Sequence, residues 1–279
     1  MTREYNALSY QCSRHVTAAY STSFSLAVKM LTPSMRDPIH AIYGFVRFAD
    51  EIVDSFHTQD QERILNEFED ELNKSLERQF SINPILNSFQ GVVHQYGIDR
   101  DLIDAFLKSM RADLYQKVYS TRKDYEDYIY GSAEVVGLMC LKVFVNGDQA
   151  KYEELKEPAI KLGSAFQKVN FLRDLKDDTL TLQRSYFPNA SLNGLNPHAK
   201  TSIINEIEEE FHQALDGIKR LPFGARFGVY TAYVYYIKLL SKLRSVSVEQ
   251  MFSERIRISN LAKIRLLFTS FVNYKLNLI

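Results

Sequence analysis

The chain has 279 residues, and its 34 Lys and Arg residues balance 34 Asp and Glu residues, so the formal net charge is zero. This balance argues against a nucleic-acid-binding protein, because such proteins usually carry a basic excess. Only 11 Gly and 7 Pro residues occur, about half of their usual combined share, which favours long uninterrupted helices. No linker-like stretch divides the sequence, so we expect one domain over residues 1–279 and no nucleic-acid partner.

Cysteine usage and hydropathy bear on the compartment. The two cysteines, Cys12 and Cys140, have no CxxC spacing, which favours a reducing, cytosolic setting. The first residues contain no apolar signal-peptide core, and the most apolar stretch, residues 227–240, is too short to span a bilayer. We therefore expect a cytoplasmic protein. Peripheral membrane association through exposed aromatic residues stays open, and the sequence does not indicate an oligomeric state.

Helices are expected along almost the whole chain, because apolar residues recur at intervals of three and four, as in Leu65, Phe68, Leu72 and Leu76. The chain is therefore expected to be all-α, one domain of roughly nine or ten helices. Breaker residues set the boundaries in chain order: residues 32–34 precede a helix through Asp54, residues 82–84 begin another, residues 96–99 end one and begin the next, residues 146–148 close a segment that starts near Asp124, and residues 186–197 form the longest breaker-rich stretch.

Two aspartate pairs are the most informative feature: Asp50 with Asp54, and Asp174 with Asp178, each with three residues between its members. In a helix this spacing places both carboxylates on one face, one turn apart. Two such faces, opposed across a cavity, would hold hard divalent cations and the diphosphate that these cations bind.

Each pair shares its predicted helix face with other polar side chains. At 100° per residue, Tyr43 and Arg47 fall with Asp50 and Asp54 within an arc of about 60°. The second face gathers Gly163, Gln167, Asn170, Asp174 and Asp178 within an arc of about 80°.

A solvated helix face is the commoner explanation of a single aspartate pair. Residues 40–53, however, contain almost no other polar side chains, and carboxylates stacked one turn apart repel each other unless a cation lies between them. Oxygen ligands suit Mg²⁺ better than Zn²⁺, and the six scattered histidines form no HxxxH pair. These residues therefore predict a magnesium–diphosphate site.

Four blocks of the sequence form a recognisable set: a Ser-Phe segment at residues 20–25, the first aspartate motif at residues 41–54, a small-residue helix at residues 128–137, and the second aspartate motif with its Arg-Ser-Tyr-Phe-Pro loop at residues 163–188. Over residues 20–263 the chain resembles the head-to-head prenyl diphosphate synthases, the family of phytoene, squalene and dehydrosqualene synthases. The resemblance implies the isoprenoid synthase fold, in which helices surround a central hydrophobic cavity that takes two prenyl diphosphates and Mg²⁺, with Mn²⁺ as an alternative ion.

The resemblance also assigns roles by position. It implies that a metal–diphosphate cluster, a reaction centre and a set of substrate contacts share one cavity. The implied metal ligands are Asp50, Asp54, Asn170, Asp174 and Asp178; the four aspartates act in catalysis with Tyr43 and Tyr128; and the substrate contacts are Ser23, Phe24, Arg47, Gln167, Asn170, Arg173 and Tyr186.

Two positions depart from the family pattern. Glu134 stands where many relatives have a small residue, so the middle of that helix is expected to be shaped differently. Some relatives carry a phosphate-contacting Tyr shortly before the C-terminal basic segment, but residues 245–254 contain none. We expect Arg255 or Arg257 to supply that contact instead.

The implied activity is the condensation of two geranylgeranyl diphosphates to phytoene, in carotenoid biosynthesis and without NADPH. Within the same family, a C30 enzyme that makes dehydrosqualene or squalene from farnesyl diphosphate is the alternative, because no single residue fixes the chain length. A non-catalytic assembly factor with the same fold is a more remote alternative, because such relatives typically lose the aspartates.

Overall fold

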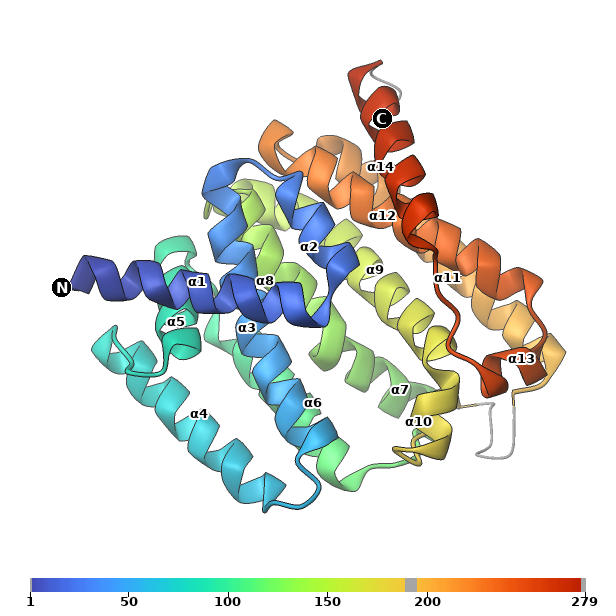
Figure 1. The fold of residues 1–279 in the computed structure, drawn as a ribbon, viewed down its shortest axis with the longest axis horizontal. Helices are drawn as coiled ribbons and strands as arrows, with labels where there is room; N and C mark the ends of the chain where they lie inside the picture. Colours follow the sequence, from blue (N-terminus) through green and yellow to red (C-terminus); the bar gives the residue numbers. More distant parts are fainter. Residues whose placement is uncertain (1, 189–194, 277–279) are drawn as a thin grey trace.

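The computed structural model describes residues 2–188 and 195–276, and within them the chain is helical, with no strand and one isolated bridge between Val118 and Ser185 (Figure 1). The all-α prediction is confirmed. The elements are α1 (Thr2–Tyr20), α2 (Thr22–Lys29), α3 (Pro33–Ser55), α4 (Gln61–Arg78), α5 (Pro84–Tyr96), α6 (Arg100–Tyr115), α7 (Arg122–Ile129), the π-helix η1 (Tyr130–Glu134), α8 (Val135–Phe144), α9 (Gln149–Arg173), α10 (Leu175–Leu180), α11 (Pro197–Arg220), α12 (Phe223–Ser245), α13 (Val248–Ser253) and α14 (Asn260–Lys275).

The expected number of helices, nine or ten, was too low, because the described residues contain fourteen α-helices and one π-helix. Several of these helices are separated by only one or two residues. Ser21 alone separates α1 from α2 and caps α2 by accepting a hydrogen bond from Phe24 N, and Asp174 alone separates α9 from α10. Neither Ser21 nor Asp174 is a Gly or Pro, so no breaker residue marks these two interruptions in the sequence.

The boundaries that breaker residues predicted are confirmed where the structure describes them. Pro33 occupies the first turn of α3, and the Asn83 side chain caps α5 directly before Pro84. Gly97 ends α5 with a φ of 62°, a left-handed conformation that glycine adopts without strain. Of the breaker-rich stretch at residues 186–197, residues 189–194 lie outside the described part.

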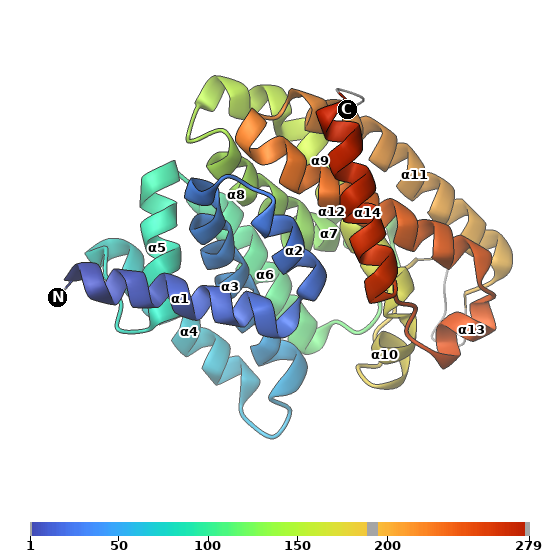
Figure 2. The same ribbon diagram turned by 45° about the horizontal axis from the view of Figure 1, so that its top comes forward.

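The apolar core has two parts, and α9 contributes to both. Tyr152 and Leu155, near the start of α9, belong to the part formed with α3, α5, α6 and α8. Val169 and Leu172, near its end, belong to the part formed with α11, α12 and the segment after α10. In Figure 1, α9 runs through the body of the molecule while α14 lies at its edge, and in Figure 2 α14 lies in front of α12. Because α9 lies inside the molecule, the polar residues near its end lie in the interior as well.

The π-helix η1 lies where α6 and α9 approach the small-residue segment most closely. A Cβ added at Gly163 on α9 would meet Ala133 O and Glu134 Cα of η1, each at 3.0 Å. Glu134 therefore lies at a backbone contact, and burial together with nearby Glu210 raises its pKa to about 7. The expected change of shape at Glu134 thus coincides with a π-helical turn, a feature often found at functional sites.

Gly131 tests whether this close packing is required. A Cβ at Gly131 would lie 2.0 Å from Ser109 Oγ and 2.7 Å from the backbone oxygen of Ala105. We expect Gly131→Ala to lower the free energy of unfolding by about 1–3 kcal/mol, measured by urea denaturation, because α6 or η1 must shift.

Gly91→Ala is the matched control, since its Cβ would meet only Tyr10 Oη at 3.5 Å. That substitution lies inside α5 and should leave stability unchanged or raise it by up to about 1 kcal/mol. Equal effects of the two substitutions would contradict the packing explanation.

Candidate active site

The first aspartate face is on α3, and an arginine already neutralises part of it. Arg47 donates from Nη1 to Asp50 and from Nη2 to Glu51. Its guanidinium also lies 4.3 Å from the centre of the Tyr20 ring. Because α3 is continuous from Pro33 to Ser55, Asp50 and Asp54 are one turn apart, as the spacing predicted.

One turn before Arg47, an aromatic pair links α3 to α2. The rings of Tyr43 and Phe24 stack with centroids 4.9 Å apart. Burial raises the pKa of Tyr43 to about 12, so its hydroxyl stays protonated at neutral pH. Ser23 lies beside Phe24 in the first turn of α2 and is half-buried. The Ser-Phe segment therefore adjoins the first aspartate face.

The second aspartate face contains a helix break that the sequence did not predict. A single helix through Asp178 was expected, but α9 ends at Arg173 and α10 begins at Leu175, with Asp174 between them at φ −97° and ψ 9°. The one-turn relation survives, because Asp178 N donates to Asp174 O at 2.9 Å. The prediction of an uninterrupted helix was wrong, whereas the prediction of adjacent carboxylates is confirmed.

Two arginines hold Asp174 at this break. Arg173 Nε donates to Asp174 Oδ1 at 2.9 Å, and Arg255 Nε lies 2.7 Å from the same oxygen. Arg255 therefore reaches the second face from the segment that follows α13. Of the two candidates that the sequence left open, the structure places Arg255 at Asp174, whereas the Arg257 carbonyl accepts a hydrogen bond from Lys242 Nζ.

Gln167 and Asn170 lie on α9 before the break, and both side chains are half-buried. Tyr236 on α12 donates from its hydroxyl to Asn170 Oδ1 at 3.1 Å. The amide oxygen of Asn170 is therefore an acceptor directed to the same interior region as Tyr236, and a metal ion would have to compete with or share this hydrogen bond.

Arg184 links the two faces, and sequence reasoning assigned it no role. Its Nη1 donates to Asp54 Oδ1 at 2.6 Å and its Nη2 donates to the backbone oxygen of Asp113 at 3.1 Å. The side chain is only 2% exposed, so the charge needs these partners. Arg184 lies in the loop after the second motif, where helical spacing gives no signal; only its place in the Arg-Ser-Tyr-Phe-Pro block indicated it.

Asp113 on α6 is a second residue that sequence reasoning missed. It is 2% exposed, its Oδ2 accepts a hydrogen bond from Tyr128 Oη at 2.8 Å, and its Oδ1 has no hydrogen-bond partner. Burial is the main cause that raises its pKa to about 7. The sequence signal that could have identified it is the position of a charged residue on the apolar face of α6.

Tyr128 and Tyr186 pack beside Arg184 and Asp113. Both are nearly buried, their rings stack with centroids 5.1 Å apart, and Tyr186 also stacks on Phe171 at 4.0 Å. The Tyr128 hydroxyl is bonded to Asp113, and Arg184 Nη1 lies 3.5 Å from the Tyr186 hydroxyl. Tyr128 therefore orients Asp113, and Tyr186 contacts the guanidinium of Arg184 that is paired with Asp54.

The two aspartate faces meet at Arg184, whose side chain donates to Asp54 Oδ1 at 2.6 Å and whose backbone N donates to Asp178 O at 2.8 Å. Burial and the charge of Asp54 raise the pKa of Asp50 to about 7. Burial, then Asp174, then Asp54 raise the pKa of Asp178 to about 8. Asp54 lies on α3 and Asp178 on α10, so charge from one face is felt at the other. The two aspartate pairs therefore lie in one region of the structure, and their joint role in holding a metal stays a prediction.

The residues fit a metal that is shared with a substrate better than a metal held by protein alone. Within residues 2–188 and 195–276, no group of three or more His, Cys, Asp or Glu side chains is arranged to hold an ion. Mg²⁺ usually takes one or two carboxylates and completes its shell with water and substrate phosphate. The raised pKa values of Asp50 and Asp178, one from each pair, suit this role, and no His or Cys at the site suggests zinc.

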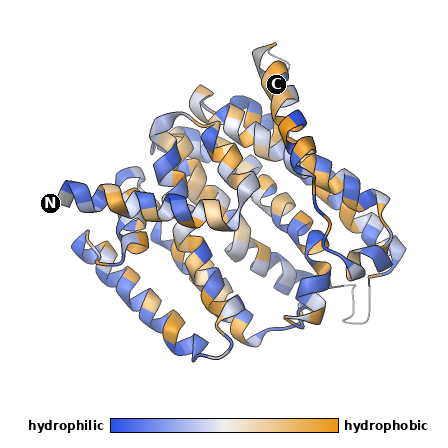
Figure 3. Cartoon of the chain, in the orientation of Figure 1, coloured by the Kyte–Doolittle hydropathy of each residue, from blue (hydrophilic) through white to orange (hydrophobic). Residues whose placement is uncertain are grey.

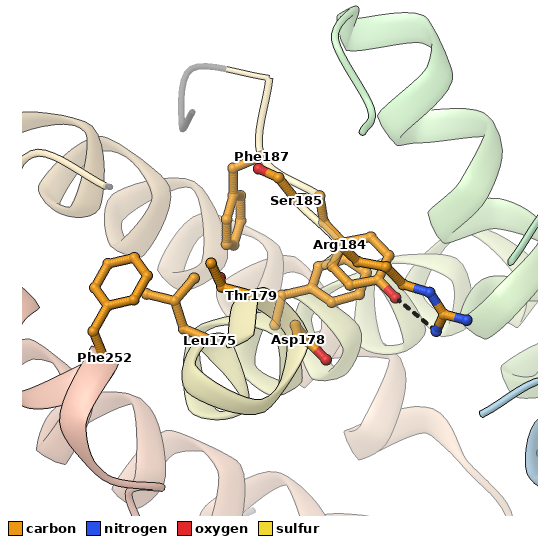
Figure 4. A pocket seen from close by; sticks show the side chains of 9 residues that line it. Leu175, Asp178, Thr179, Arg184, Ser185, Phe187 and Phe252 are labelled. Carbon is orange, nitrogen blue, oxygen red and sulfur yellow. Dashed lines mark hydrogen bonds between the residues drawn. The ribbon is translucent and has the colours of Figure 1, made fainter. Parts of the chain in front are cut away.

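A small cavity lies beside Asp178 and Arg184 (Figure 4). Leu175, Phe187 and Phe252 form its apolar side, and its volume of about 10 Å³ is room for roughly one water molecule. A prenyl chain does not fit there.

Comparison with known proteins agrees with this geometry. The family model "Squalene/phytoene synthase" matches residues 17–262. The chain is 30% identical to 15-cis-phytoene synthase of Synechocystis sp., covering 85% of this chain and 77% of that protein. It is 28% identical to 4,4'-diapophytoene synthase of Staphylococcus haemolyticus, covering 72% and 68%.

Solved structures share the fold. A dehydrosqualene synthase in complex with ligand superimposes with a TM-score of 0.83 at 22% identity, covering 98% of each chain. Squalene synthase HpnC from Alicyclobacillus acidocaldarius gives 0.74 at 19% identity, covering 88% of this chain and 94% of that chain. The fold is therefore that of the isoprenoid synthases, and the chain belongs to the squalene/phytoene synthase family of prenyltransferases.

Proposed function

We propose that the protein catalyses the Mg²⁺-dependent head-to-head condensation of two geranylgeranyl diphosphates to phytoene, through a cyclopropylcarbinyl diphosphate intermediate, in carotenoid biosynthesis. The observation that carries the proposal is the opposition of Asp50 and Asp54 to Asp174 and Asp178, with arginines paired to three of these four carboxyls. Such a site is built to exchange its internal ion pairs for a metal-bound diphosphate.

The exchange follows from charge. Arg47, Arg173 and Arg184 pair with aspartates, and each guanidinium can instead donate to diphosphate oxygens. The released carboxylates, with Asn170, would then hold Mg²⁺, or Mn²⁺ in its place. When bound, the ion acts as a Lewis acid that neutralises charge on the departing diphosphate.

Loss of diphosphate leaves an allylic carbocation that must be kept from water. Tyr43 presents an aromatic face stacked on Phe24, and its raised pKa keeps it from forming a phenolate that would trap the cation. Phe166 and Tyr236 form a second stacked pair, with centroids 4.0 Å apart, near Asn170. Gln167, Ser23 and Phe24 are the proposed contacts to the reacting ends of the substrates.

A C30 product is the second candidate. A 4,4'-diapophytoene synthase is among the relatives, at an identity close to that of the phytoene synthases. The cavity that the described residues form beside Asp178 is too small to hold a prenyl chain, so its size does not distinguish a C15 from a C20 substrate. Product analysis therefore has to distinguish the two candidates.

Purified protein, supplied separately with geranylgeranyl diphosphate and farnesyl diphosphate in Mg²⁺ buffer, provides the test. We expect a C40 hydrocarbon from the C20 substrate, detected by chromatography and mass spectrometry, and no requirement for NADPH. A C30 hydrocarbon as the main product would replace phytoene by dehydrosqualene or squalene, and no hydrocarbon from either substrate would contradict the proposed chemistry.

Aspartate variants connect this activity to the site. Asp174→Ala should lower the turnover by about 10³-fold or more, because the departing diphosphate loses electrostatic stabilisation. Asp177→Ala is the matched control, since this neighbouring carboxylate is exposed and should leave the turnover nearly unchanged. Equal losses in both variants would indicate disruption of α10 and would refute the assigned role.

The raised pKa of Asp178 predicts a pH dependence of stability in metal-free buffer. A carboxyl with a folded-state pKa of about 8 contributes most stability below pH 4 and loses that contribution as the pH rises towards 8. Asp178→Asn does not titrate. At pH 8 it should therefore be more stable than the parent by about 1–3 kcal/mol, measured by urea unfolding with a chelator present.

The difference between Asp178→Asn and the parent protein should shrink towards pH 4. Asp177→Asn controls for the loss of one charge at an exposed site on the same helix and should follow the parent at every pH. Superimposable pH profiles for Asp178→Asn and the parent would show that the opposed carboxylates do not repel each other.

A further inference from the structure

Helix α14 carries an apolar stripe on its exposed side. Leu261, Ile264, Phe268 and Phe271 are 61%, 62%, 69% and 45% exposed. At 100° per residue these four positions fall within an arc of about 80°. Figure 1 places α14 at the outer edge of the molecule, Figure 2 shows it in front of α12, and Figure 3 shows hydrophobic residues recurring along it. Isolated exposed apolar residues are ordinary, but a continuous stripe of this kind marks a contact surface.

The other side of α14 is fixed to the protein. Tyr274 contacts the rings of Phe223 and Phe227 on α12, with centroids 5.6 and 5.1 Å apart, and Ser270 is 1% exposed. Phe223 itself is 75% exposed, so it extends the stripe onto the start of α12. The stripe is thus presented by a docked helix and not by a detached tail.

The two helices beneath this surface carry only positive charge. Although the whole chain is neutral, neither α12 nor α14 contains an Asp or Glu residue. The side chains that the structure describes on them include six basic residues, Arg226, Lys238, Lys242, Arg244, Lys263 and Arg265, of which Arg244 pairs with Glu208 of α11 at 2.7 Å.

We infer that α14 and the start of α12 dock the protein on an anionic lipid bilayer, with the stripe inserted among the acyl chains at the interface and the basic side chains near the headgroups. An apolar face flanked by Lys and Arg is the pattern of helices that lie in the membrane surface. Each basic residue near an anionic leaflet adds to the attraction. No helix in the described residues is long and apolar enough to cross a bilayer, so the contact is peripheral.

A second copy of the chain fits this surface less well. A two-fold dimer through α14 would bring two identical, acid-free faces together, and like charges across an interface oppose association. An anionic lipid surface satisfies the apolar stripe and the positive charge at once.

Docking on this face places the candidate site near the bilayer. Lys263 Nζ donates to Thr22 Oγ1 at 3.2 Å, and Thr22 begins α2, which carries Phe24 beside Tyr43. An amphipathic substrate could therefore pass between the bilayer and the α2 side of the site. This consequence rests on the proposed function, whereas the docking itself does not.

Vesicle co-sedimentation of the full chain tests the inference. We expect the protein to sediment with phosphatidylcholine vesicles that contain phosphatidylglycerol, and Ile264→Asn/Phe268→Asn to lower the partition coefficient by at least about tenfold, because two apolar side chains leave the interface. Ile82→Asn is the matched control, since Ile82 is 83% exposed in the turn between α4 and α5 and should not affect sedimentation. Unchanged melting temperatures would show that each variant is folded.

A second variant tests how much the positive charge contributes to vesicle binding. Lys238→Gln/Arg265→Gln removes two exposed charges from α12 and α14 and should weaken binding to anionic vesicles several-fold while leaving the weak binding to neutral vesicles unchanged. The inference is overturned if the parent does not sediment with anionic vesicles, or if Ile264→Asn/Phe268→Asn binds as the parent does. It is equally overturned if the parent is a dimer that this variant converts to a non-binding monomer. Loss of vesicle binding with unchanged condensation of detergent-dispersed substrate would leave the proposed function standing.

Discussion

Repulsion among carboxylates brought together from three helices is the constraint on which the site depends. Burial raises the pKa values of Asp50 on α3, Asp113 on α6 and Asp178 on α10, and the nearby charge of Asp54 raises each of these three further. Packing alone gains nothing from such an arrangement. It is tolerated because arginines offset part of the charge, and it becomes favourable when cations enter. The apolar helical body keeps this charge out of bulk water, which strengthens every interaction within it.

The fold sets up this arrangement through small departures from regular helix. The break at Asp174 turns the chain between α9 and α10 while keeping Asp178 one turn away, and it allows Arg255 to approach from the segment after α13. The π-helical turn at residues 130–134 lets α9 pack closely through Gly163. The polar residues near the end of α9 can then face the candidate site, while its apolar residues on another side pack in the core.

Much of this was predictable from the sequence, because helical spacing relates neighbouring residues reliably. The all-α class, the boundaries of α3 and α5, and the adjacency of Asp50 to Asp54 all follow from residues within one or two turns of each other. Arg184 and Asp113 could not be assigned in the same way, since their roles depend on tertiary contacts 71 and 130 positions apart along the chain. The break at Asp174 was also hidden, because its backbone conformation is open to any residue and leaves no glycine or proline signal.

Calorimetric titration of Mg²⁺ into the protein, with and without inorganic diphosphate, tests the central claim most directly. If the opposed aspartates hold the ion only together with diphosphate, Mg²⁺ should bind weakly alone and at least about tenfold more tightly with diphosphate, and Mg²⁺ should strengthen diphosphate binding by the same factor. Equal Mg²⁺ affinity in the presence and absence of diphosphate would contradict the account.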